Sequence, residues 1–203
     1  MATNPQRGRN EGPDYRWSVA FGRMWGMTEI RTPRLILRRW SDDDLVPLSE
    51  IHADPEVMRW IDDGSTLDLD QTAEAIERWE DEWDEEGFGL FAVELLASGE
   101  LIGAVGLSVP EHLPKVMPAV EITWRLGRSY WGQGYASEAA QATLEFALQD
   151  RGLDRVICVN RAGNEDSENV IRKLGMADDG TLTHPESGAL LSLHSIDLTE
   201  YEA

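Results

Sequence analysis

Two glycines between a strand pattern and a helix pattern constrain this chain more than any other feature of its sequence. Residues 120–140 read VEITWRLGRSYWGQGYASEAA, where an apolar strand pattern runs into Gly132 and Gly134 and then directly into an alanine-rich helix pattern. Glycine lets backbone N–H groups approach a phosphate closely, and a helix N-terminus adds unpaired donors and a positive partial charge. The segment therefore predicts an anion-binding turn.

Two common nucleotide-binding turns do not match this segment. It lacks the Lys and Ser/Thr of a nucleotide P-loop and the three-glycine spacing of a dinucleotide-binding fold. Both interpretations are disfavoured.

Periodicity along the chain predicts a mixed α/β sheet. Strand patterns and helix patterns alternate without an internal repeat, and prolines at 110, 114 and 118 bracket one loop. Ser41 with Asp44, and Asp54 with Pro55, are typical helix starts. The expected strands are 34–40, 88–96, 101–107, 119–126, 155–159 and 190–198, and the expected helices are one after Asp44, one after Asp54, 70–86, 136–149 and 167–174.

Charge and composition narrow the class of partner and the compartment. The net charge of −20 disfavours nucleic acid as a partner. No stretch approaches the roughly 18 apolar residues that span a bilayer, which predicts a cytoplasmic protein without a membrane partner. The negative charge has two readings. It reflects the source of the chain, as does the low lysine content, with Lys115 and Lys173 the only lysines, or it gathers cationic amine substrates.

Cysteine and histidine usage argues against a metal site. Cys158 is the only cysteine, which excludes an intrachain disulfide and a cysteine-based zinc site, and its strand context predicts a small core residue. The histidines at 52, 112, 184 and 194 lack metal-ligand spacing, so no metal is expected.

Residues 1–27 carry no helix or strand periodicity and mix Gly, Pro, Asn and Arg. We expect a disordered tail, or a start codon placed too early with Met27 as the true beginning; an Arg-rich targeting segment is a third reading. The folded domain is expected to cover residues 28–203.

The segment at Trp131–Ala136, WGQGYA, resembles the acetyl-CoA pyrophosphate loop of the GCN5-related N-acetyltransferase (GNAT) family, whose pattern is Gln/Arg-x-x-Gly-x-Gly/Ala. Trp131 departs from the usual Gln or Arg, as happens in the ribosomal-protein N-terminal acetyltransferase (RimJ/RimL-like) branch. Residues 164–176, NEDSENVIRKLGM, are similar to the family's Asn-x-x-Ser/Ala run ending in Lys-Leu-Gly-Phe. The start TPRLILRRWSDDDL also resembles that branch.

This resemblance implies an α/β (α+β) GNAT fold. Its central sheet is mixed, mostly antiparallel and splayed between the fourth and fifth strands, with helices on both faces, and acetyl-CoA is the co-substrate. Backbone groups near Trp124 and Leu126 are then expected to pair with the pantetheine amides. The residues expected at the acetyl-CoA site are Trp124, Leu126, Trp131, Gly132, Gln133, Gly134, Tyr135, Ala136, Ser137, Asn164 and Ser167.

Two residues are the candidates for proton transfer. Glu121 matches a position that often bears the family's base, and its alternative is a solvated strand residue. Many family members protonate the thiolate with a tyrosine seven residues after the asparagine, but Ile171 stands there. Ser167 is the expected substitute, with a water as alternative; it could instead cap the following helix.

The expected function is transfer of acetyl from acetyl-CoA to a primary amine by direct attack in a ternary complex. The acceptor stays open between a small-molecule amine and a protein N-terminus. A non-catalytic acyl-CoA-binding module is the alternative. The resemblance also implies a possible homodimer.

Overall fold

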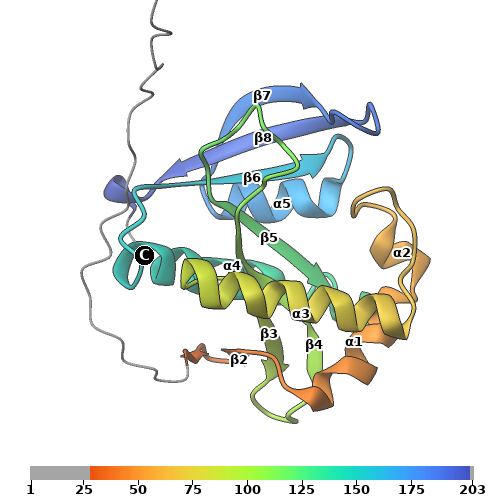
Figure 1. Ribbon diagram of the computed structural model, residues 1–203. Helices are drawn as coiled ribbons and strands as arrows, with labels where there is room; N and C mark the ends of the chain where they lie inside the picture. Colours follow the sequence, from red (N-terminus) through yellow and green to blue (C-terminus); the bar gives the residue numbers. More distant parts are fainter. Residues whose placement is uncertain (1–27, 202–203) are drawn as a thin grey trace, which may run out of the picture.

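The computed structural model describes residues 28–201, so the expectation of a tail at residues 1–27 lies outside the described residues. Figure 1 shows the chain in sequence order. The elements are β1 Ile30–Arg31, β2 Leu35–Arg38, α1 Leu45–His52, α2 Pro55–Met58, α3 Leu69–Glu86, β3 Leu90–Leu95, β4 Leu101–Ser108, β5 Glu121–Leu126, α4 Tyr135–Gln149, β6 Arg155–Arg161, α5 Glu165–Lys173, β7 Ala177–Thr183 and β8 Leu190–Asp197.

Within residues 28–201 the strands form one eight-stranded sheet in the order β1-β2-β3-β4-β5-β6-β8-β7. Neighbouring strands are antiparallel except β5 and β6, which run parallel. The prediction of a mixed, mostly antiparallel sheet is confirmed. Its single parallel pair, β5 and β6, corresponds to the fourth and fifth of the expected strands, because β1 was not among them, and the sheet opens between these two strands.

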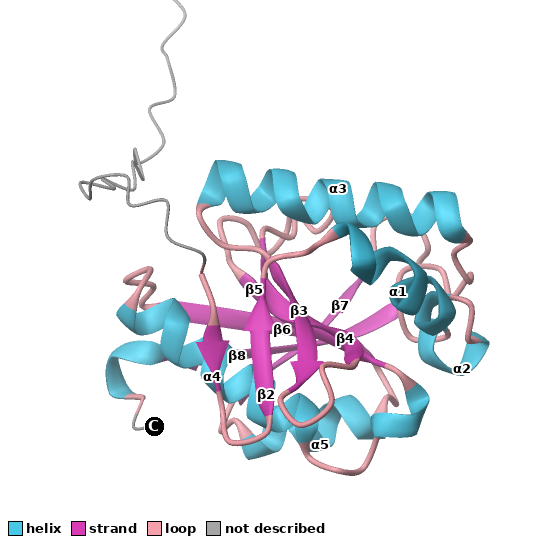
Figure 2. Ribbon diagram, turned by 90° about the horizontal axis from the view of Figure 1, so that it is seen from below, coloured by secondary structure: helices cyan, strands magenta, loops and turns pink. Residues whose placement is uncertain are grey.

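Helices cover both faces of the sheet, as expected. Figure 2 shows α3 along one face and α5 along the other. The largest group of buried residues fills the space between the sheet and its helices, and it includes Phe91, Ile122 and Leu144. Its aromatic centre is Trp83, Phe91 and Phe146, whose rings meet at centroid distances from 4.8 to 6.0 Å.

The starts of the first two helices were predicted correctly. Ser41 and Asp44 form a capping box at the turn before α1, and the Asp54 carboxylate accepts from the Glu56 N–H at the start of α2. Two strands were missed. The two-residue β1 is too short for a pattern, and β7, ADDGTLT, is mostly exposed and lacks apolar alternation.

No helix within the described range is both long enough and apolar enough to cross a membrane.

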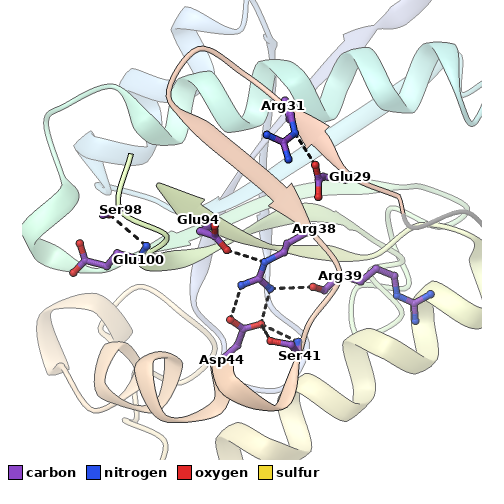
Figure 3. Close-up of polar contacts among 9 residues, drawn as sticks. All are labelled: Glu29, Arg31, Arg38, Arg39, Ser41, Asp44, Glu94, Ser98 and Glu100. Carbon is purple, nitrogen blue, oxygen red and sulfur yellow. Dashed lines mark hydrogen bonds and ion pairs between the residues drawn. The ribbon is translucent and has the colours of Figure 1, made fainter. Parts of the chain in front are cut away.

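An ion-pair network joins β2 to the turn before α1 and to β3 (Figure 3). Arg38 donates to both carboxylate oxygens of Asp44, at 2.7 and 2.9 Å, and to Glu94 at 2.9 Å. Burial alone would raise the pKa of Asp44, but hydrogen bonds from Arg38 and Ser41 outweigh it and lower that pKa. The carboxylate therefore contributes stability above its unfolded pKa, and this contribution is lost as the pH falls through the folded pKa.

Asp44→Ala should destabilise the fold by about 2–3 kcal/mol, because it removes the capping box and leaves Arg38 without its bidentate partner. The exposed pair Arg31–Glu29 provides the control: Arg31→Ala should change the free energy of unfolding by less than about 0.5 kcal/mol. Urea unfolding measures both. Equal losses in the two variants would contradict the role of the Arg38 network.

Candidate active site

The pairing between β5 and β6 stops almost where it begins. Within the described residues their register is a single pair, Glu121 with Ile157, and the Ile157 N–H donates to the Val120 carbonyl at 2.9 Å. If the parallel ladder continued, the next N–H of β6 on this edge, that of Val159, would donate to a backbone carbonyl of β5. Here it donates to Glu121 Oε1 at 3.2 Å. A side chain thus replaces a rung of the ladder, and the strands separate beyond it.

Glu121 is not the solvated strand residue of the alternative reading, since only 8% of it is exposed. Burial raises the pKa of its carboxyl to about 8, against the lowering effect of the Val159 N–H, with a further contribution from the charges of Asp62 and Glu82. A carboxyl group with this pKa can take up and release a proton near neutral pH.

Two cavities meet where β5 and β6 separate. One, of about 790 Å³, is lined by α3, the loop before β5 and the β7–β8 turn; Glu121 belongs to it. The other, of about 440 Å³, is lined by the glycine segment, α4 and α5. Both reach Thr123, Trp124 and Arg125 of β5 and Val159 and Asn160 of β6. A molecule in one cavity can therefore touch a molecule in the other.

The glycine segment has the backbone that the sequence predicts. Gly132 and Gly134 have φ of +72° and +83°, which other residues adopt only with strain. Gly134 precedes the first residue of α4, and no side chain caps the N-terminus of that helix. The first N–H groups of α4 are thus available to an anion at the rim of the smaller cavity.

Contacts from the turn between β1 and β2 hold this segment in place. Glu138 of α4 accepts from the Thr32 hydroxyl at 2.6 Å and from Arg34 Nε at 2.6 Å. Arg34 also donates to the Gln133 carbonyl at 3.0 Å and lies over the Tyr135 ring. The loop and the start of α4 are therefore held by the turn between β1 and β2.

The structure gathers nearly all of the predicted acetyl-CoA-site residues around the smaller cavity. Gln133 does not line it; its side chain donates back to the Ser129 carbonyl at 2.9 Å and shapes the loop. Trp131 Nε1 donates to the Leu126 carbonyl at 2.8 Å, which ties the loop to the end of β5. The predicted residues that line the cavity are Trp124, Leu126, Trp131, Gly132, Gly134, Tyr135, Ala136, Ser137, Asn164 and Ser167.

Asn164, and not Ser167, caps α5. Asn164 is the N-cap of α5, and its Oδ1 accepts from the Ser167 N–H at 3.3 Å. The expectation that Ser167 could cap this helix is wrong, because α5 begins at Glu165 and Ser167 lies within its first turn. Ser167 is only 8% exposed and lines the cavity. Ile171, in place of the family tyrosine, is a core residue.

Sequence reasoning missed a half-buried cation. Arg125 donates to His52 Nε2 at 2.9 Å, and His52 Nδ1 lies 3.1 Å from the Thr72 hydroxyl. A guanidinium only donates, so the proton of the neutral imidazole is on Nδ1. Burial, reinforced by Arg125, lowers the pKa of His52 to about 3. The alternation Glu121, Thr123, Arg125 on one strand face was the available signal.

Cys158 is buried in β6, and burial raises the pKa of its thiol, which agrees with the core role predicted for it. Within the described residues no group of three or more His, Cys, Asp or Glu side chains is placed to hold a metal ion.

Comparison with known proteins gives the class that this fold and site define. Residues 34–177 match the model of the acetyltransferase (GNAT) domain. The chain belongs to this family and is an N-acetyltransferase. Over 178 residues it is 26% identical to a protein of Bacillus licheniformis named as an uncharacterized N-acetyltransferase, p20, covering 87% of this chain and 98% of that one.

Solved structures agree with the fold. A GNAT-family acetyltransferase of Bacillus anthracis superimposes with a TM-score of 0.71 at 26% identity, covering 85% of this chain and all of that one (100%). RimL, a ribosomal alpha-N-protein acetyltransferase in complex with coenzyme A, superimposes with a TM-score of 0.70 at 17% identity, covering 84% of this chain and 98% of that one. The second likeness supports the fold alone.

The residues of the smaller cavity fit the coenzyme that this family uses. A Cβ added at Gly132 would meet nothing within 4 Å, so this stretch of the loop is open to a ligand. The uncapped N-terminus of α4 suits a pyrophosphate, and Lys173 supplies a positive charge on the same cavity.

Gly132→Ala should weaken acetyl-CoA binding about tenfold, because a Cβ strains the loop and takes the open space beside its N–H groups. Gly152 is the matched control, with φ of +63° at the other end of α4 and equally open space. Both variants should lose about 1 kcal/mol of stability. Calorimetric titration with acetyl-CoA separates them; similar affinity in the two variants would argue against phosphate binding at this loop.

Proposed function

We propose that this N-acetyltransferase moves acetyl from acetyl-CoA to a primary amine by direct attack in a ternary complex. The observation that carries the proposal is the meeting of two cavities at the separation of β5 and β6. The smaller cavity would hold the acyl donor and the larger one the amine. Holding both reactants together supplies much of the rate enhancement in such a reaction.

The edge of β5 that faces β6 supports the position of the donor. From Ile122 to Leu126 this strand pairs with β4 on one side, and the described residues give it no partner on the other. Its free backbone groups are available to the pantetheine amides. The Leu126 carbonyl already accepts from Trp131, so we assign the main contact to the backbone near Trp124.

Glu121 is the proposed general base. An amine must be neutral to attack, and it loses a proton as the new bond forms, so a carboxylate at the junction is suited to accept that proton directly or through a water. Glu121 also accepts from Val159, which fixes its orientation. Glutamine could accept the same hydrogen bond, so Glu121→Gln removes the base while keeping the contact.

The rate constant kcat should rise with pH through about 8, as Glu121 ionises. In Glu121→Gln this pH dependence should disappear, and kcat near pH 8 should fall about 100-fold. Release of CoA thiol measures both. A Gln variant that keeps the wild-type pH profile would exclude Glu121 as the base, while unchanged acetyl-CoA affinity in the variant would show that the donor site is intact.

The stability of the same variant provides an independent check. The folded-state pKa of Glu121 is above its unfolded value, so the folded protein binds more protons and loses stability as the pH rises from about 4.5 to about 8. Glu121→Gln removes this loss. The variant should melt about 3 °C or more above the wild type at pH 8.5, with a smaller difference at pH 5.

Ser167 is the proposed acid for the departing thiolate, and a bound water is the alternative. Its support is the position on the donor cavity, since Asn164 and not Ser167 caps α5. Ser167→Ala should lower kcat about tenfold with little change in the melting temperature, because its hydroxyl has no structural partner within the described residues. Unchanged turnover would assign the proton to water.

The acceptor class is tested with CoA-thiol release across N-terminal peptides, amino acids and small amines. RimL acts on a ribosomal protein N-terminus, and this is one candidate class for the present chain. Turnover on any primary amine would support the proposed reaction. Tight acetyl-CoA binding without turnover on any of them would favour a non-catalytic acyl-CoA-binding module.

A further inference from the structure

The larger cavity is strongly acidic. Besides Glu121, six carboxylates line it, from α3 and from the loops opposite. Three arginines, Arg78, Arg125 and Arg161, also line the cavity. Arg125 donates to His52, and Arg161 donates to the backbone carbonyls of Arg59 and Asp62. Negative charges therefore outnumber positive ones even when Glu121 is protonated. The six carboxylates are Asp62, Asp81, Glu82, Glu85, Glu86 and Glu111.

These carboxylates begin directly beside the proposed base. Glu82 accepts from the Val109 N–H at 2.7 Å, and Val109 follows Ser108, the register partner of Glu121. Burial, reinforced by the charges of Glu86 and Glu111 and opposed by the Val109 N–H, raises the pKa of Glu82 to about 7. The smaller contribution, repulsion among the neighbouring carboxylates, is relieved by a bound cation.

A polar atom at the junction of the cavities is independent support for a ligand there. Asn160 is 92% buried and lines both cavities. Its amide nitrogen donates to the Arg161 carbonyl at 3.2 Å, which fixes the other end of the amide as the oxygen, and within the described residues that Oδ1 has no partner. A buried acceptor without a donor is costly, and an amine N–H would satisfy it once the Asn160 side chain turns towards the cavity, because the oxygen is covered in this structure.

We propose that the acceptor is a diamine or polyamine, whose reacting nitrogen lies between Asn160 Oδ1 and Glu121 and whose second ammonium group is held by the carboxylates of α3. This inference rests on the proposed acetyl transfer. A monoamine would fill the reacting position alone, whereas the second charge would use the acidic wall.

The test compares two acceptors that differ only in the second ammonium group, the four-carbon α,ω-diamine and butylamine. We expect kcat/KM to be at least about tenfold higher for the diamine, and the preference to shrink as the ionic strength rises. Equal kcat/KM values for the two amines would overturn the proposal. So would an N-terminal peptide with a single amine as the better substrate.

Substitutions on α3 test where the second ammonium group binds. Glu85→Gln with Glu86→Gln should reduce the preference for the diamine to about twofold or less. Glu74→Gln with Glu77→Gln is the matched control, because both residues are exposed on the same helix outside the cavity and the change in net charge is identical. An equal effect of the two double variants would show that long-range attraction alone favours the diamine. It would contradict binding of the second ammonium group at Glu85 and Glu86.

Direct binding separates failure of this inference from failure of the proposed reaction. Calorimetric titration of the CoA-bound protein with each amine needs no turnover. Diamine-selective binding without turnover would support the site and overturn the reaction, whereas turnover without selective binding would do the reverse. Asn160→Ala should lower kcat/KM for both amines about tenfold and leave their ratio unchanged, because it removes only the contact to the reacting nitrogen.

Discussion

The interaction on which the site depends is the hydrogen bond from the Val159 N–H to the Glu121 carboxylate. It replaces a backbone rung at the point where β5 and β6 part, so β6 can leave β5 without an orphaned amide. The carboxyl group is buried at this point, and burial raises its pKa to about 8 against the lowering effect of the Val159 N–H. One side chain thus allows the sheet to open and places a titratable group at the opening.

The opening has different electrostatic properties on its two sides. The smaller cavity offers glycine N–H groups, an uncapped helix N-terminus and Lys173, which suit an anionic donor. The larger cavity is lined by carboxylates, which suit a cationic acceptor. Since the two ligands carry opposite charges, each cavity disfavours the ligand of the other. Although the whole chain carries a net charge of −20, the carboxylates at the site are gathered on the side of the larger cavity.

The local parts of this arrangement were predictable from sequence, because they depend on neighbouring residues. The capping box at Ser41, the proline start of α2 and the glycine turn all follow from short-range rules. The contacts that define the site join distant segments. Glu82 with Val109 is one such contact and Arg125 with His52 another, and no spacing rule connects them. The edge strand β7 was missed because its side chains are mostly exposed, which removes the apolar alternation that marks a strand.

Arg125 explains the direction in which an acceptor would extend. A carboxylate partner would neutralise this half-buried guanidinium, but the groups that it contacts are the neutral His52 and the face of Trp79. Burial lowers its pKa only to about 10, so the charge is kept at neutral pH. A positive charge at the junction repels an ammonium group there. The reacting nitrogen must therefore be neutral, and the second ammonium of the proposed acceptor lies away from Arg125 and Trp79, towards the carboxylates at the C-terminal end of α3.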